Sequence, residues 1–385
     1  MPGQIGIRAT FMRGGTSKGL FFHWDDLPED ETDRDRFICA ALGSPDPNGR
    51  QLDGMGGGVS SLSKVMLVRA SQRPGIDIDY LFGQVAIDRL LVDRAANCGN
   101  LSSAVGVYAV REKMVQLPNG PVTLAMFNEN TGKRIDCHLT VNNGCPAVRG
   151  DLHIDGVAGG GSPIRLDFVA PGGAATGHLL PTGRPVDMIR MDCGNDIEVS
   201  IVDATNPCVF LSACDFDLIG TESPHALGED AEKMAWFEEL RVRAGEMAGI
   251  GGGHSVPPSA PKIATVAPPM PSHTLDGRVL DPDEGDIQIR MLSMGKPHLA
   301  IPLTGALCAG VAARIDGTVV QKAARPKQSG EMLRVMHGSG VISVLGEVRH
   351  RDGTWHAQHA SVMRTARVLM EGTVYAPAPL VEAAE

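Results

Sequence analysis

Short strand-like segments separated by glycine- and proline-rich turns restrict the fold of this chain more than any other feature. Glycine supplies 47 and proline 26 of the 385 residues. Polar and apolar residues alternate in several segments, which we expect to be half-buried strands: 5–12, 64–68, 76–85, 122–127 and 134–141. Helical patterns are fewer, at 33–42, 101–110, 231–248 and 304–313. Many strands around few helices predict an α+β fold.

The length of the chain predicts two domains, each large enough to bury its own core. The segment 172–187 is rich in turn residues and lies near the midpoint, so we place the boundary there. This gives domains at 1–187 and 188–385, and leaves the last strand free to return to the first domain. The two halves share a coarse pattern in which a strand ends in a tight turn and a small-residue helix begins, at Cys98 and at Thr304.

Charge and composition exclude several classes of function. The net charge of −10 provides no basic field that would attract nucleic acid or an anionic membrane. The first ten residues lack a signal-peptide pattern, and the apolar run 299–313 is too short to span a bilayer. We therefore expect a cytosolic protein. None of the eight cysteines forms a Cys-x-x-Cys pair, and His350, His356 and His359 lack an acidic partner at ligand spacing, so we expect no metal site.

The segment 12–19, with the sequence MRGGTSKG, gathers two cations, two hydroxyls and three glycines. Side-chain and backbone donors concentrated in one turn suit a carboxylate. A nucleotide-binding P-loop would need the lysine before the hydroxyl residue and a longer glycine spacing. The glycine run 54–58 likewise lacks the preceding strand of a dinucleotide-binding motif. The segment 12–19 therefore predicts an acid-binding loop.

Lys64 and Cys98 are the candidate reactive groups. Lys64 follows a glycine-rich loop and three serines and begins an apolar strand, where partial burial would lower its pKa toward that of a general base. The alternative is a solvated lysine at a strand end. Cys98 precedes a small-residue helix whose backbone N–H groups would favour the thiolate. The alternative is a buried, inert thiol. The similar sequence at Cys193 precedes a strand-like run, 197–202, and predicts a turn without chemistry.

A third cluster lies before the helix at 304–313. Arg290, Lys296 and His298 surround the sequence SMGKPH and offer groups that could hold carboxylates. The alternative is ordinary surface charge. The residues alone leave both interpretations open.

Several segments together resemble the PrpF family: MRGGTSKG (12–19), GSPDP (43–47), DGMGGG…SLSK (53–64), DYLFGQV (79–85), NCGNLSS (97–103), APP (267–269), SMGKPH (293–298) and RTARVLMEG (364–372). The resemblance spans almost the whole chain. It implies a fold similar to diaminopimelate epimerase, in which two alike domains each wrap a sheet around a central helix and the active site lies between them. It also implies no cofactor and no metal. A homodimer and a functional pairing with an aconitase-type dehydratase stay open.

The resemblance implies that Lys64 and Cys98 are catalytic. It implies that the residues around them bind substrate: Arg13, Gly14, Gly15, Thr16, Ser17, Lys18, Ser60, Ser63, Asn97, Gly99, Asn100, Leu101, Arg290, Met294, Lys296, His298, Thr304 and Gly305. Related epimerases use one thiol from each domain. Here the second helix start, at Thr304, carries no cysteine, and Cys308 lies one turn inside the helix. This difference favours allylic proton transfer over racemisation.

The implied function is a cofactor-independent isomerase of a small unsaturated di- or tricarboxylate. The sequence SMGKPH favours 2-methylaconitate cis-trans isomerisation. The alternatives are a 3-methylitaconate isomerase and a 4-oxalomesaconate tautomerase, which need the same groups. An alternative from another class is a non-catalytic tricarboxylate-binding accessory protein of an aconitase-type enzyme. A pure binder has no need of a base and a thiol, so Lys64 and Cys98 discriminate between the two classes.

Overall fold

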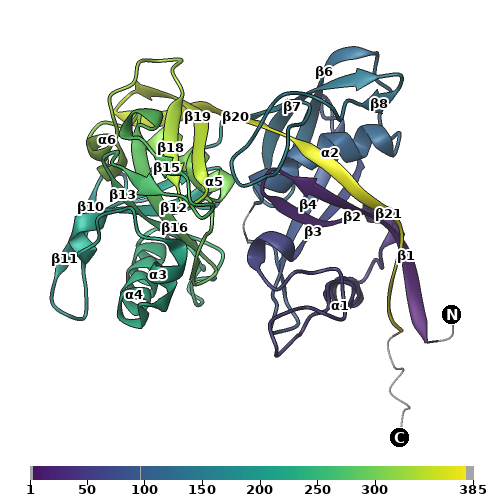
Figure 1. The fold of residues 1–385 in the computed structure, drawn as a ribbon, viewed down its shortest axis with the longest axis horizontal. Helices are drawn as coiled ribbons and strands as arrows, with labels where there is room; N and C mark the ends of the chain where they lie inside the picture. The colour runs from purple at the N-terminus through teal and green to yellow at the C-terminus, as the bar shows by residue number, and fades with distance from the viewer. Residues whose placement is uncertain (1–2, 96, 379–385) are drawn as a thin grey trace, which may run out of the picture.

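A computed structural model describes residues 3–95 and 97–378, which form two α+β lobes placed side by side (Figure 1). The first lobe contains α1 (Glu31–Leu42), α2 (Gly99–Arg111) and the strands β1 (Gln4–Gly14), β2 (Ser17–His23), β3 (Lys64–Ala70), β4 (Ile78–Val85), β5 (Val92–Asp93), β6 (Gly120–Asn128), β7 (Lys133–Asn142), β8 (Cys145–Pro146) and β9 (Ile164–Val169). A short 3₁₀ turn, η2 (Ser60–Leu62), precedes β3.

The second lobe contains the helices α3 (Pro224–Glu229), α4 (Ala231–Met247), α5 (Leu303–Ala312) and α6 (Val319–Ala323). Its strands are β10 (Asp187–Arg190), β11 (Asp196–Ala204), β12 (Asn206–Ser212), β13 (Lys262–Ala267), β14 (Ser272–His273), β15 (Val279–Leu280), β16 (Ile287–Ser293), β17 (Lys296–Pro297), β18 (Leu333–His337), β19 (Gly340–Arg351) and β20 (Thr354–Arg364). The last strand, β21 (Ala366–Pro377), runs back to the first lobe and pairs with β1.

Each lobe wraps its strands around one buried helix. The residues of α2 from Gly99 to Val110 are all buried, as are all residues of α5. Both helices are buried on every side, so each forms the centre of its lobe's core. Small residues let the strands approach closely: a Cβ at Gly106 would lie 2.7 Å from the Cys137 sulfur, and one at Gly310 would lie 2.9 Å from Val344.

The strands and long helices predicted from alternation and helical periodicity are all present. Their ends differ by one to a few residues; for example, β1 continues to Gly14. The turn at Cys193 is followed by β11, as expected, and Cys308 is buried inside α5, where its thiol donates to the Val202 carbonyl. The short helices α3 and α6 were not predicted, because six and five residues are too few to show a helical period.

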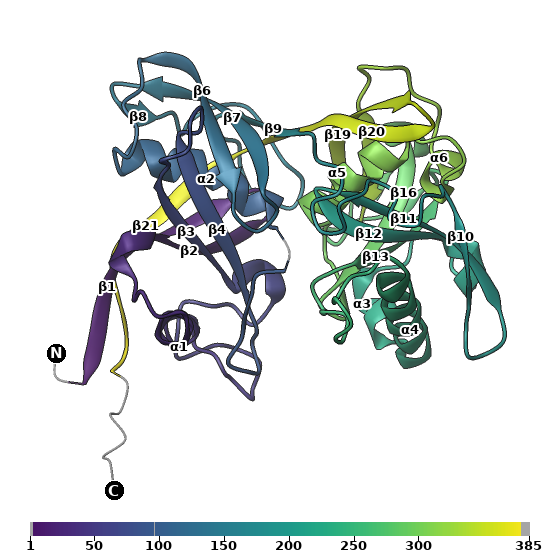
Figure 2. The ribbon, with the colours of Figure 1, turned by 180° about the vertical axis from the view of Figure 1, so that it is seen from behind.

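Two strands connect the lobes. β9 pairs with β7 in the first lobe and with β20, and Figure 2 shows β9 and β20 running together between the lobes. The segment 172–186 bonds to the second lobe, since the Gly173 amide donates to the Asp203 carbonyl and the Ala175 and Thr176 amides donate to its carboxylate. We propose that the two lobes are the two expected domains and that this segment belongs to the second.

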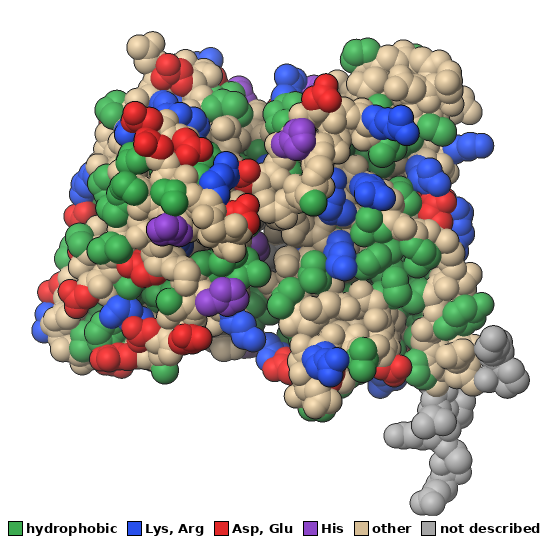
Figure 3. All heavy atoms as spheres, viewed as in Figure 1, with side chains coloured by type: hydrophobic (Ala, Val, Ile, Leu, Met, Phe, Trp, Pro, Cys, Tyr) green, Lys and Arg blue, Asp and Glu red, His purple; other side chains and the backbone are tan. Residues whose placement is uncertain are grey.

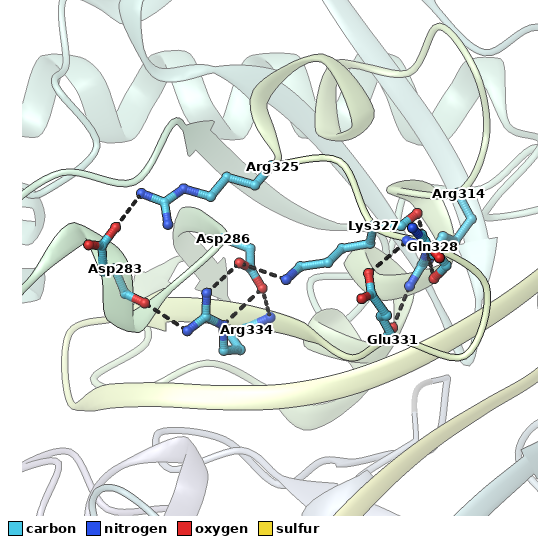
Figure 4. A network of polar contacts seen from close by, with 8 residues as sticks. All are labelled: Asp283, Asp286, Arg314, Arg325, Lys327, Gln328, Glu331 and Arg334. Carbon is cyan, nitrogen blue, oxygen red and sulfur yellow. Dashed lines mark hydrogen bonds and ion pairs between the residues drawn. The ribbon is translucent and has the colours of Figure 1, made fainter.

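A buried carboxylate fixes the start of β16. The Asp286 side chain has no exposed surface and accepts from the Arg334 guanidinium at 2.7 Å, the Arg334 amide at 2.8 Å and Lys327 Nζ at 3.0 Å (Figure 4). Burial alone would raise the pKa of Asp286, but the hydrogen bonds from Arg334 and Lys327 outweigh it and hold that pKa below its usual value. The network ties β16 to β18 and to the loop after α6.

No helix in the described part of the chain is long and apolar enough to cross a membrane.

Candidate active site

A narrow pocket lies where the two lobes meet, and the surface is hollowed along the same junction (Figure 3). It is narrow, with about 40 Å³ of free space. Both lobes line it with polar side chains, among which Lys64 and Cys98 come from the first lobe and Lys262 and His298 from the second.

Lys64 is the first residue of β3 and is only 8% exposed. Its Nζ donates to Gln84 Oε1 at 2.5 Å, directly across the β3–β4 ladder, and lies 5.0 Å from the centre of the Phe82 ring. The Gln84 amide donates to the carbonyls of Ser60 and Ser63, which orients its oxygen toward the lysine. The amine is therefore held in one place by a neutral partner.

Burial lowers the pKa of Lys64, and the nearby Cys98 thiol opposes this shift without reversing it. Desolvation disfavours the ammonium form, and no carboxylate of a described residue forms an ion pair with Lys64 to restore it. A lysine in this environment is a suitable general base near neutral pH.

Cys98 is the N-cap residue of α2 and is 8% exposed. The unpaired N–H groups of the first helical turn lie next to it, at Gly99 and Asn100, which also line the pocket. A Cβ added at Gly99 would lie 3.0 Å from Leu303 and 3.2 Å from Thr304, the first residues of α5. The N-termini of both central helices therefore meet at this pocket, and their partial positive charge favours an anion there.

Lys262 lies in the same pocket and was not among the residues predicted from sequence. It is 6% exposed, and its Nζ donates to the Ser259 carbonyl at 3.1 Å. Burial lowers the pKa of Lys262 to about 8; the Cys208 thiol opposes this shift, whereas the nearby Lys64 adds to it. The sequence signal was present, because Lys262 begins an apolar strand just after Ser259, much as Lys64 follows Ser63.

His298 contributes a neutral ring. Its pKa is lowered first by burial and then by the charges of Lys64 and Lys262. Its Nδ1 atom is buried and has no hydrogen-bond partner among the described residues. An unpaired buried nitrogen beside a pocket is available to a bound ligand.

The pocket brings together many of the predicted site residues and some that were not predicted. Besides Lys64 and Cys98, the predicted residues that line it are Ser17, Ser60, Asn97, Gly99, Asn100, Met294, His298 and Thr304. The additional lining residues are Phe82, Gln84, Ser259, Lys262, Ser293, Pro302 and Leu303. Other predicted residues lie outside the lining: Arg13, Gly14, Gly15, Thr16, Lys18, Ser63, Leu101, Arg290, Lys296 and Gly305.

The predicted acid-binding loop supports the pocket from behind, and only Ser17 lines it. The Arg13 guanidinium donates through Nη1 to the carbonyls of Gly15 and Thr365 at 2.9 Å and through Nη2 to the Thr365 hydroxyl, which ties it to this part of the protein. The Gly15 amide donates to the Thr365 carbonyl. Side chains at Gly14 and Gly15 would collide with Asn100, at 2.5 Å and 2.1 Å. These glycines therefore allow the loop to pack against the start of α2.

Other side chains of this loop and of its neighbours also contact partners within the protein. Thr16 accepts from the Asn100 amide, and Lys18 lies 5.4 Å from the centre of the Phe11 ring. The Ser63 hydroxyl donates to the Val85 carbonyl. Leu101 is fully buried in the core.

The remaining predicted residues belong to the second lobe. Arg290 donates to the Glu222 carbonyl at 2.7 Å, Lys296 is exposed, and Gly305 packs against Met291. Among the described residues no group of three or more His, Cys, Asp or Glu could hold a metal ion.

A buried amine, a thiol and two helix N-termini surround one small pocket on this paired α+β fold. Two solved structures share the fold at low sequence identity: a hydroxyproline epimerase (TM-score 0.56, 10% identical, 97% of this chain and 94% of that one) and a probable proline racemase (TM-score 0.57, 12% identical, 98% and 94%). The predicted epimerase-like α+β fold is therefore confirmed.

The chain belongs to the PrpF family, since the family described as PrpF protein matches residues 4–377. It is 39% identical to the 3-methylitaconate isomerase of Eubacterium barkeri over 97% of this chain and 98% of that one. It is 37% identical to the 2-methyl-aconitate isomerase of Shewanella oneidensis, over 98% of both. A crystal structure of methylitaconate-delta-isomerase superposes with a TM-score of 0.78 at 37% identity, over 97% of this chain and 96% of that one. The predicted family and isomerase class are confirmed.

Proposed function

We propose that this isomerase converts 2-methylaconitate between its cis and trans forms by allylic proton transfer. The observation that carries the proposal is the position of Lys64, whose buried amine lies in the same pocket as the Cys98 thiol and the N-termini of α2 and α5. Both reactive groups come from the first lobe, and the second lobe closes the pocket with Lys262 and His298.

The charges of the pocket favour a substrate with three carboxylates. Lys64 and Lys262 are buried, and within residues 3–95 and 97–378 neither forms an ion pair with a carboxylate. A buried charge is costly unless it is compensated, so an anion is the natural partner of Lys262. The two helix N-termini add two further positions for carboxylate oxygens. Lys262 and the two helix N-termini are three groups that attract anions, and they suit a tricarboxylate better than a dicarboxylate such as 3-methylitaconate.

Proton transfer starts from the neutral form of Lys64. Its amine removes a proton from the carbon next to the C=C–COO⁻ group and becomes an ammonium ion. The electron pair left behind spreads through the double bond onto the carboxylate and gives a dienolate. Fixed donors that face this charge stabilise it, and Lys262 and the first-turn amides of α2 and α5 are such donors.

The geometric outcome depends on where the proton returns. While the charge is delocalised, the former double bond has single-bond character and can rotate. If Lys64 returns the proton to the carbon it left, the product is the other geometric isomer. If a proton is delivered to the other allylic carbon, the double bond migrates instead. Cys98 adjoins the helix start and would hydrogen-bond to the dienolate.

Proton NMR in heavy water tests the proposal. The protein is incubated in parallel with 2-methylaconitate, 3-methylitaconate and 4-oxalomesaconate, and signal loss is followed at each carbon. We expect cis-trans conversion of 2-methylaconitate with deuterium entering its allylic methylene. Turnover of another acid alone would assign a different substrate. Tight binding without any exchange would instead assign a non-catalytic binding protein.

A further inference from the structure

We propose that an apolar chamber next to the catalytic pocket receives an alkyl substituent of the substrate, and that Met294 forms the wall between the two spaces. The inference rests on the proposed function, because it assigns a specificity subsite to the same pocket.

The chamber has a volume of about 150 Å³ and lies between α4 and the strands β13 and β16. Its lining is mainly apolar and includes Met234 and Phe237 from α4, Ile263 from β13 and Leu292 from β16. A cavity of this size lined by such side chains can hold an apolar molecule as large as benzene. By contrast, the catalytic pocket has only about 40 Å³ of free space.

The charged groups of the chamber are already paired. The Arg241 guanidinium donates to both carboxylate oxygens of Glu238, at 2.7 and 2.8 Å, and to the Pro257 carbonyl at 2.8 Å. Both side chains are thus satisfied within the protein and leave no free charge to attract a carboxylate. The chamber therefore fits hydrocarbon, whereas the catalytic pocket fits the acid groups.

Two residues, Ser293 and Met294, line both spaces. They lie at the tip of the β16–β17 hairpin, where Ser293 pairs with Lys296 across a turn formed by Met294 and Gly295. The chamber thus adjoins the catalytic pocket and is separated from it by these two residues. We therefore assign the chamber to a part of the molecule that is bound in the neighbouring pocket.

The identity of residue 294 is unusual for its backbone. Met294 has φ 55° and Gly295 has φ 71°. Both central residues of such a two-residue turn have positive φ, and asparagine or glycine is normally found at the first position. The chain follows this rule elsewhere: the equivalent turn between β7 and β8 is Asn143-Gly144, with φ 52° and 72°. A methionine there is strained, which points to a role for its side chain. Its flexible thioether suits a wall that must adapt to different groups.

The test uses aconitates carrying hydrogen, methyl, ethyl or propyl at the same carbon, with the wild type and Met294→Gly. Glycine accepts positive φ, so this variant keeps the turn and is expected to fold. We expect Met294→Gly to raise kcat/KM for the propyl compound relative to the methyl compound by about 15-fold. This factor corresponds to burying two methylene groups at ~0.8 kcal/mol each. If the ratio of kcat/KM for the propyl compound to that for the methyl compound is the same in both proteins, the proposal is wrong.

A second substitution tests the location. Adding Met234→Trp to Met294→Gly fills the chamber from α4 and should abolish the gain, whereas adding Met247→Trp should preserve it. Met247 lies on the same helix, is 41% exposed and does not line the chamber. If the gain survives Met234→Trp, the alkyl group lies elsewhere and the proposal is wrong. The Asn143→Gly variant controls for the change of turn residue.

Binding measurements separate this proposal from the proposed function. Saturated tricarballylates with the same substituents cannot undergo allylic proton transfer, and calorimetry gives their dissociation constants. We expect affinity in Met294→Gly to increase with alkyl length and in the wild type to increase less. Turnover of 2-methylaconitate by the wild type, together with an affinity series in Met294→Gly that does not rise with alkyl length, would reject only the chamber. A rising series without any turnover would reject only the isomerase function.

Discussion

Lys262 occupies in the second lobe the position that Lys64 occupies in the first. Lys64 begins β3, which runs parallel to β2, and Lys262 begins β13, which runs parallel to β12. Each lysine lies near the N-terminus of its lobe's central helix, where the N-cap residue is Cys98 in α2 and Pro302 in α5. The pocket thus contains two equivalent lysines but one thiol. This asymmetry favours a base with an anion anchor over the paired thiols of a racemase.

Replacing Lys64 should remove proton abstraction and spare binding. We expect Lys64→Ala to abolish deuterium incorporation from heavy water while the dissociation constant of a tricarboxylate changes by no more than about tenfold, or ~1.4 kcal/mol. In the wild type, kcat/KM should rise with pH as the lowered pKa of Lys64 is passed, because only the neutral amine is a base. Lys18→Ala, outside the pocket, is the control. Retained exchange in Lys64→Ala would eliminate this lysine as the base.

Replacing Lys262 should weaken the binding of the substrate carboxylate that is not held by the two helix N-termini. A charge-assisted hydrogen bond contributes about 1.5–3 kcal/mol, so Lys262→Met should raise the dissociation constant of a tricarboxylate about 10- to 100-fold. The dissociation constant of a dicarboxylate analogue should change less. Lys262→Arg, which keeps the charge, should recover part of the affinity. Equal losses for both acids would indicate a general disturbance of the pocket.

The same lysine gives binding a defined pH dependence. The pKa of Lys262 is lowered by burial to about 8, so its ammonium form is lost as the pH rises through that value. Affinity for the acid should therefore fall above about pH 8 in the wild type, and this fall should be absent in Lys262→Met. The lowered pKa also means that the charged lysine destabilises the empty protein at neutral pH. Urea unfolding of the ligand-free Lys262→Met protein should then give a stability higher by about 1–3 kcal/mol.

Much of this site was predictable because its parts are local in sequence. Lys64 begins a strand and Cys98 begins a helix, and the residue pattern around each indicates both the element and its end. The sequence also indicated the loop at Gly14 and Gly15, but it did not reveal that the loop packs against the start of α2. Which groups face the substrate depends on pairings such as Arg13 with Thr365, far away in sequence. No local pattern reveals that this guanidinium hydrogen-bonds to Thr365.

The contribution of the second lobe was the harder part. Arg290 and Lys296 carry obvious charges, yet one is tied to the Glu222 carbonyl and the other is exposed. Lys262 follows Pro257, Pro258 and Pro261, and prolines indicate rigid turns without indicating a reactive group. Its importance becomes clear when the two lobes are compared, because in each lobe a lysine begins a strand and the central helix follows later in the sequence. Such equivalence belongs to the tertiary fold, since the two halves lack a fixed sequence period.

Replacing Cys98 should reduce turnover without disturbing the helix. Cys98→Ser keeps a small polar N-cap, so α2 should still begin at Gly99. A hydroxyl is a far weaker acid than a thiol, and we expect kcat to fall by about 100-fold or more, within the range attributed to positioned acid–base groups. Circular dichroism checks the fold, and Cys193→Ser, at an exposed turn, is the matched control. A kcat equal to that of the wild type would make the thiol structural.

The carboxylate of Asp286 should matter for stability and not for chemistry. Asp286→Asn leaves Arg334 and Lys327 without their anion, and because both cations partly reach solvent we expect a loss of about 2–3 kcal/mol in the free energy of unfolding. The pKa of Asp286 is below its usual value, so its contribution is complete above the pKa of an unfolded aspartate and is lost as the pH falls through the folded value. The stabilities of the wild type and the variant should therefore converge below about pH 4. Urea titrations at several pH values measure this.

Asp283→Asn is the control: Asp283 pairs with Arg325, but its side chain is 89% exposed, so the substitution should cost less than about 0.5 kcal/mol. A constant difference between Asp286→Asn and the wild type at all pH values would show that the two proteins differ by packing and not by this charge.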